Sequence, residues 1–149
     1  MKKSFKLLLA TGLVGISFAT TTVYMNTSTP NAPIAYAMSK QAKINKAVSI
    51  MQDNYEGQAD VYYDKENDAI AIKPTTEDFE EAVIAVLDGD ASESDWHKLT
   101  DSIDDLSKTV YEDVHIKTPI AIVNPENTDK VLYASYDGTT LYDVMDDNN

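Results

Sequence analysis

The 149-residue chain carries 25 acidic residues against 12 basic ones, all of them lysine, which gives a formal net charge of −13 at pH 7, and it contains no cysteine. So negative a chain repels nucleic acid and other polyanions, which excludes nucleic-acid binding. The absence of cysteine excludes disulfides, thiol catalysis and thiolate metal sites together. The fold must therefore rest on a packed core, and the chain is long enough to bury one.

Residues 1–37 have the layout of a secretory signal peptide. Three lysines within the first six residues precede an apolar stretch at 7–18, and Ala35-Tyr36-Ala37 supplies the small-x-small pattern of a cleavage site. Ser17-Phe18-Ala19 offers a second cleavage point, after Ala19. The sequence therefore predicts export, with cleavage after Ala37 or after Ala19.

A permanent membrane anchor is the alternative to cleavage. The apolar stretch is shorter than the roughly twenty residues that a spanning helix needs, and no later segment could cross a bilayer. Cleavage after Ala37 would remove three lysines and no acid, which lowers the net charge from −13 to −16. We expect residues 38–149 to form one acidic domain, secreted or held at the cell surface, that makes no membrane contact.

The first predicted elements are a helix and a β-hairpin. Apolar residues recur at steps of three and four over 40–55, which predicts a helix that Gly57 ends. Residues 59–64 alternate between apolar and polar, as in a half-buried strand, and Ile70 and Ile72 repeat the alternation after the turn-forming residues 65–68.

Two more helices should follow. Thr75 or Thr76 can cap the first of them, and Gly89 can end it. Ser92 then precedes the strongest helical periodicity in the chain, carried by Trp96, Leu99, Ile103, Leu106 and Val110. This spacing favours a helix that lies on a sheet, because a coiled coil needs at least three or four heptads.

The chain ends in three predicted strands. Residues 120–123 form the first, a turn follows at 124–127, and Asp137-Gly138 joins the last two as a hairpin. The predicted fold is α+β: an antiparallel sheet of about five strands, made of a β-hairpin and a three-strand C-terminal meander, packed against about three helices.

The last hairpin gives the one positive indication of function. A two-residue turn at Asp137-Gly138 would place Tyr133 opposite Tyr142 and Val131 opposite Val144 on one face. Tyrosine beside aliphatic side chains is favoured in contact surfaces, so these four residues are the candidate binding site if the helices cover the opposite face. The alternative is that this face is the core, with the tyrosine hydroxyls reaching its edge.

A near-match to a calcium loop lies between the second and third predicted helices. Its spacing of positions one, three, five and seven is met by Asp88, Asp90, Ser92 and Ser94. Position six is Glu93 where glycine is needed, and position twelve is the apolar Leu99 where a bidentate glutamate is needed. We expect no metal site and no cofactor, since Gly89 and Ser92 act equally well as helix caps.

The sequence nominates no catalytic residue. His97 and His115 belong to no metal-ligand pair such as HExxH, and no serine has the G-x-S-x-G context of an exposed nucleophile. Among 25 acids, some carboxylates will lie close together by chance, so no pair is singled out as a glycosidase-like site.

The last third of the chain resembles the tails of small uncharacterised secreted proteins of Gram-positive bacteria. The motifs concerned are 124–127, 131–133, Asp137-Gly138 and 141–143, behind a helix with Trp96 and Leu99. The resemblance implies secretion and this fold, and it implies no activity, ligand or catalytic residue.

We expect a non-enzymatic secreted binding protein that acts on an extracellular or cell-surface protein, and the acidic charge favours a basic partner. One alternative is a structural envelope protein that assembles with itself as a homo-oligomer through the same tyrosine face. A small secreted hydrolase is the other, which would show an acidic pair of raised pKa in a concave pocket.

Overall fold

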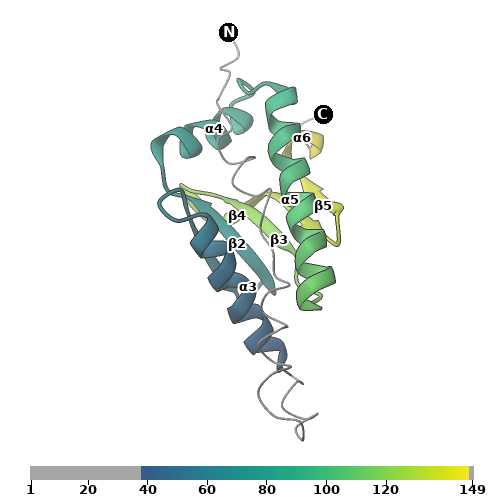
Figure 1. Cartoon of the computed structure of the whole chain (residues 1–149). Coiled ribbons are helices and arrows are strands. Elements are labelled where there is room, and N and C mark those ends of the chain that lie inside the picture. Colours follow the sequence, from purple (N-terminus) through teal and green to yellow (C-terminus); the bar gives the residue numbers. More distant parts are fainter. Residues whose placement is uncertain (1–37, 148–149) are drawn as a thin grey trace, which may run out of the picture.

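The computed structural model describes residues 38–147, so the predicted signal peptide lies outside the described residues. These residues form an α+β fold of five strands and four helices (Figure 1), which confirms the predicted class. The helices are α3 (Lys40–Asn54), α4 (Glu77–Leu87), α5 (Glu93–Val114) and the short α6 (Val144–Asp147). The strands are β1 (Ala59–Asp64), β2 (Ala69–Pro74), β3 (Ile120–Asn124), β4 (Asn127–Tyr136) and β5 (Thr139–Asp143).

The five strands form one sheet in the order β1-β2-β3-β4-β5. The predicted hairpin and the predicted C-terminal meander are both present, but β2 and β3 join them in parallel. The prediction of a purely antiparallel sheet is therefore wrong. The cause is the pair of helices between β2 and β3, because a helical crossover returns the chain to the end of the sheet where it started.

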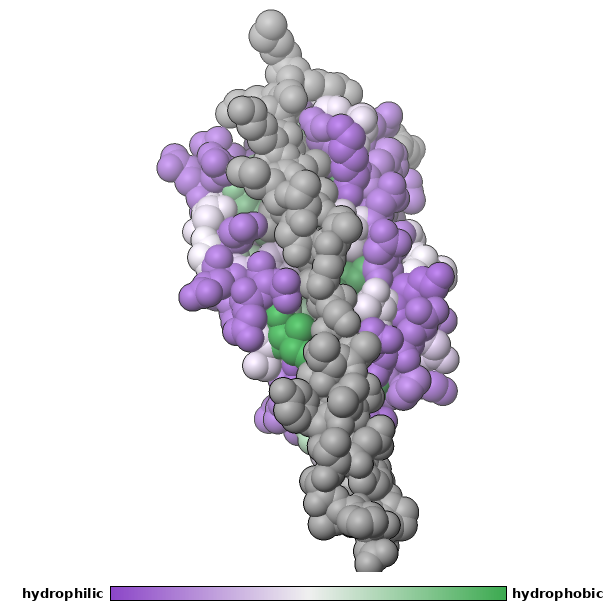
Figure 2. Space-filling model, in the orientation of Figure 1, coloured by the Kyte–Doolittle hydropathy of each residue, from purple (hydrophilic) through white to green (hydrophobic). Residues whose placement is uncertain are grey.

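Both long helices lie side by side on one face of the sheet, and α4 lies beyond its end (Figure 1). On this side the described surface is mostly hydrophilic, with hydrophobic groups visible in small areas between the helices (Figure 2). None of the helices among residues 38–147 is long and apolar enough to cross a membrane. The main core lies between this helix layer and the sheet.

Local capping chemistry sets where the first two helices begin and end. Ser39 Oγ accepts from the N–H of Ala42 at 3.1 Å, and Thr76 Oγ1 accepts from the N–H of Phe79 at 3.4 Å. Thr76 is thus the cap that the sequence left open between two threonines. At the end of α4, Gly89 has φ = 75°, a left-handed conformation that glycine adopts without steric cost.

Helix α5 buries the stripe that its spacing predicted. All five apolar positions of that stripe are at most 3 % exposed, and Trp96 is fully buried as the expected core anchor. The ring of Trp96 meets that of Tyr133 on β4 edge to face, with centroids 6.2 Å apart. The helix is thereby fixed over the C-terminal half of the sheet.

Candidate functional site

The sheet has two faces of different composition. On the face under α3 and α5, hereafter the covered face, neighbouring strands place large side chains opposite one another. One row across the sheet consists of Val61, Ile72, Ile122, Tyr133 and Asp143. The first four of these are at most 6 % exposed, so this face is filled by the helix layer.

The opposite face, hereafter the open face, carries small residues in the middle and tyrosines at the sides. The equivalent row there consists of Tyr62, Ala71, Ala121, Ala134 and Tyr142. Beside this row, Val123 pairs with Val131. Three alanines thus form a flat floor between two tyrosines.

Tyr62 reaches from one end of this row toward β4. It stands on β1, yet its hydroxyl group hydrogen-bonds with Thr128 at the start of β4, two strands beyond its neighbour β2. In the middle of the row, Ala71 and Ala121 are only 1 % and 3 % exposed. The centre of the open face is therefore buried, and Tyr62 lies beside it in the same row.

Acidic residues surround the phenol of Tyr62. Its pKa is raised, first by burial and then by the negative charges of Asp64, Asp129 and Asp60. At the other end of the row, a hydrogen bond with Asp147 raises the pKa of Tyr142. Both aromatic ends of the open face are thus next to carboxylates, an arrangement that favours cations.

The structure separates the four residues predicted to form the binding site. Val131 and Tyr142 lie in the rows of the open face, where both are half-buried, and Tyr142 also packs against the core. Tyr133 is 2 % exposed and Val144 is 9 % exposed, and both belong to the core. The predicted shared face is therefore wrong, and for Tyr133 the alternative of a core position is confirmed.

Two irregularities in the strands cause this separation. The two-residue turn is present as predicted, with positive φ at Asp137 and Gly138 and with Tyr136 opposite Thr139. The register then shifts by one residue at Leu141, so that Ala134 faces Tyr142 and Tyr133 faces Asp143. A second shift at Leu132 separates Val131 from the alternation of Tyr133.

The hydroxyl group of Tyr133 is held inside the molecule. It donates to Asp104 of α5 at 2.7 Å and lies 2.8 Å from the hydroxyl of Thr140. Burial raises its pKa, and the negative charge of Asp104 adds to this effect. Nearby, Trp96 Nε1 donates to Asp143 Oδ1 at 2.9 Å. Tyr133 therefore links α5 to the last hairpin and is not available to a partner.

A second buried contact makes the same link. Ser107 Oγ of α5 lies 2.8 Å from Ser135 Oγ of β4, and it accepts from the N–H of Gly138 at 2.9 Å. The sequence did not reveal this role of Ser107 and Ser135, because nothing local marks a buried serine pair. The pair holds the hairpin turn against the helix.

The residues with calcium-loop spacing act as helix ends. Asp88 ends α4, Ser92 precedes α5, and the N–H groups of Asp90 and Ala91 both donate to the carbonyl of Ala85. Within residues 38–147, no three histidines or acids are grouped so as to hold a metal ion. His97 and His115 are both exposed, at the beginning and the end of α5.

Tyr62 is the main residue that sequence reasoning missed. Its alternation with Asp60 and Asp64 was visible, but it indicated only the polar side of a half-buried strand. No family model, curated protein or solved structure matches the chain. The open face itself is therefore the feature from which a function can be inferred.

Proposed function

We propose that the protein is a secreted, non-enzymatic binding protein whose open face holds a basic extracellular or cell-surface protein. The observation that carries this proposal is the pair Tyr62 and Tyr142, standing at either end of an alanine floor and next to carboxylates. Tyrosine offers a rigid apolar ring, a hydroxyl group and a π face for Lys or Arg, and carboxylates complement the positive charge. Export is supported by the signal-peptide pattern at 1–37.

A pull-down from culture supernatant and cell-wall extract tests this proposal. The tagged protein is compared with the double variant Tyr62→Ala/Tyr142→Ala and with Tyr111→Ala, which removes a tyrosine of α5 instead. We expect the parent and Tyr111→Ala to recover the same lysine- or arginine-rich protein, and the double variant to lose it. Salt should release the partner, because screening weakens exposed charge pairs.

Two results would contradict the proposal. Equal recovery by the double variant would show that the open face is not the contact surface. Recovery of no basic protein by any form, from either fraction, would refute a basic protein as the partner. Circular dichroism of the three proteins controls for folding.

A further inference from the structure

The two edge strands of the sheet differ in how their free backbone groups are treated. At the β1 edge, the N–H of Ala59 donates to the carbonyl of Tyr55 at 3.1 Å. The side chain of Gln52 then bonds twice, donating to the carbonyl of Ala59 at 3.1 Å and accepting from the N–H of Val61 at 2.8 Å. Helix α3 thus caps the first half of this edge against a further strand.

At the other edge, β5 has no counterpart of Gln52 among the described residues. Tyr136 and Thr139 close the two-residue turn, and the alternation of an antiparallel ladder then directs the N–H and C=O of Thr140 away from β4. The strand contains neither lysine nor proline, which proteins use to protect an edge. The N–H and C=O of Thr140, which precede the irregularity at Leu141, are therefore open to pairing.

An exposed apolar side chain lies on the same strand. Leu141 is 55 % exposed and is the one large hydrophobic residue exposed among residues 38–147. It is also the extra residue of the β5 irregularity, opposite Ala134. An open edge beside an exposed leucine is what an added strand would cover.

We propose that β5 is a docking edge that takes an extended, basic segment of a partner protein as a sixth strand. This inference rests on the proposed function, since it gives the mode by which the same basic partner is held. Tyr142 belongs both to β5 and to the end of the alanine row, so edge and open face form one continuous surface.

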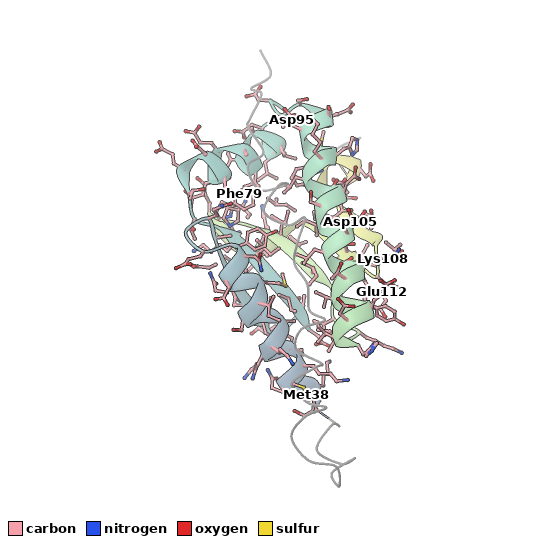
Figure 3. All side chains as sticks on the ribbon, in the orientation of Figure 1. Met38, Phe79, Asp95, Asp105, Lys108 and Glu112 are labelled. Carbon is pink, nitrogen blue, oxygen red and sulfur yellow. The ribbon has the colours of Figure 1, made fainter. Side chains whose placement is uncertain are left out.

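Charge decides which occupant fits this edge. Exposed acids stand at both ends of β5, Asp137 before it and Asp146 and Asp147 after it. Lys108 packs its stem against the turn at Gly138. Asp105 and Glu112 lie on either side of Lys108 along α5 (Figure 3), so the acids outnumber it.

A second copy of the chain fits less well. Two-fold pairing of β5 with β5 is antiparallel, and it would bring Asp137 of one copy toward Asp146 and Asp147 of the other at both ends of the contact. Like charges placed opposite each other are destabilising. An extended segment with lysines or arginines around an apolar residue meets the acids and covers Leu141.

The test uses a nine-residue peptide of alternating lysine and valine, with two control peptides. Alternating lysine and proline keeps the charge but cannot form a strand, and alternating glutamate and valine keeps the strand but reverses the charge. Backbone amide exchange is followed by NMR at Thr140 and, on the opposite edge, at Tyr63. With the lysine-valine peptide at about ten times its Kd, exchange at Thr140 should slow about tenfold and exchange at Tyr63 should not change.

Leu141→Lys and Leu141→Glu form a matched pair of variants, because both remove the apolar contact and differ only in charge. Leu141 is exposed, so both should fold, and thermal melting checks this. The lysine-valine peptide should bind Leu141→Lys at least about threefold more weakly than Leu141→Glu, since like charges repel.

Three results would overturn the β5 proposal. They are equal binding of the lysine-proline peptide, protection at Tyr63 in place of Thr140, and no binding of the lysine-valine peptide. Chemical-shift changes at Ala121 without protection at Thr140 would also overturn it while supporting the open face. The pull-down with the Tyr62 and Tyr142 variant decides the proposed function separately.

Discussion

Alternate residues of the same strands form the covered and open faces, yet the two faces are buried in different ways. On β3, Ile120 and Ile122 fill the space under the helices, while Ala121 and Val123 point the other way. All four are at most 3 % exposed, although the two long helices lie on one face only. The strand is therefore buried on both sides, and on the open side Tyr62 reaches toward β4.

This difference suits the covered face to stabilising the fold and the open face to binding a partner. The covered face buries large side chains among helices, where packing leaves little freedom. On the open face, the central side chains are small alanines, and Tyr62 of the edge strand contacts Thr128 through its hydroxyl group. A surface closed by side chains can rearrange for a partner more easily than one closed by helices.

The largest expected effect is the loss of stability when a large side chain is truncated, which should differ between the two faces. Ile122→Ala should lower the free energy of unfolding by about 2–5 kcal/mol, because it empties a fully buried site under the helix layer. Val131→Ala on the open face should cost less than about 1 kcal/mol, since this half-buried site can relax. Urea titration followed by the fluorescence of the sole tryptophan, Trp96, measures both.

A comparable loss in the two variants would contradict the distinction between the faces. It would mean that the open face is packed as tightly as the covered one. The slope of the urea transition should remain that of the parent for both variants, because neither changes the area exposed on unfolding by much.

The next effect concerns the polar link between α5 and the last hairpin. Ser107→Ala should cost about 1–3 kcal/mol, because it leaves the N–H of Gly138 and the buried hydroxyl of Ser135 without their shared partner. In a double-mutant cycle, Ser107→Ala and Ser135→Ala together should cost less than the sum of the two single changes. Strict additivity would show that the two hydroxyl groups do not act as a pair.

A smaller effect is expected when an alanine of the open face is enlarged. Ala121→Leu should destabilise by about 1 kcal/mol, because the larger side chain overpacks a buried site in the same row as Tyr62 and displaces that tyrosine. The tyrosine should then contact Thr128 less, which NMR shifts of Thr128 would report. Ala134→Leu is the matched control, since Ala134 lies nearer Tyr142 along the same row. Unchanged Thr128 shifts in Ala121→Leu would contradict the position of Tyr62.

Much of the fold could be predicted because it depends on local pattern. The buried stripe from Trp96 to Val110 is a spacing that only a helix satisfies, and the turn at Asp137-Gly138 requires two positive φ values. The threonine cap and the glycine end of α4 are equally local. These features need no knowledge of distant residues.

The candidate site could not be predicted from the sequence. It depends on extra residues within the strands and on contacts between distant residues, and the hydrophobic pattern shows neither. Each irregularity adds one residue, at Leu132 and at Leu141, and each such residue shifts the pairing on one side of it. Val131 and Tyr142 therefore reach the open face while Tyr133 turns inward. Tyr62 acts through Thr128, 66 positions along the chain, which no periodicity reveals.

The smallest expected effect tests how the covering helix is fixed to the sheet. Lys40 at the start of α3 donates to both carboxylate oxygens of Asp68, at 2.7 and 3.0 Å, and Tyr63 donates to the same group at 2.6 Å. These contacts lower the pKa of Asp68, with Lys40 the larger cause. A carboxylate with a lowered pKa stabilises the fold above its unfolded value of 3.8, and this contribution is lost as pH falls through the folded pKa.

Asp68→Asn should therefore lower the melting temperature slightly at pH 7, and the difference from the parent should disappear as pH falls below the lowered pKa of Asp68 in the folded protein. The effect is small because both charged groups are exposed, and added salt should reduce it. Lys98→Gln is the control, since its partner Asp95 is three residues away on the same helix and the pair joins no separate elements. A difference between Asp68→Asn and the parent that persists at low pH would assign the loss to packing of the turn. The covering helix would then be held mainly by its apolar stripe and by the hydrogen bonds of Gln52 to β1.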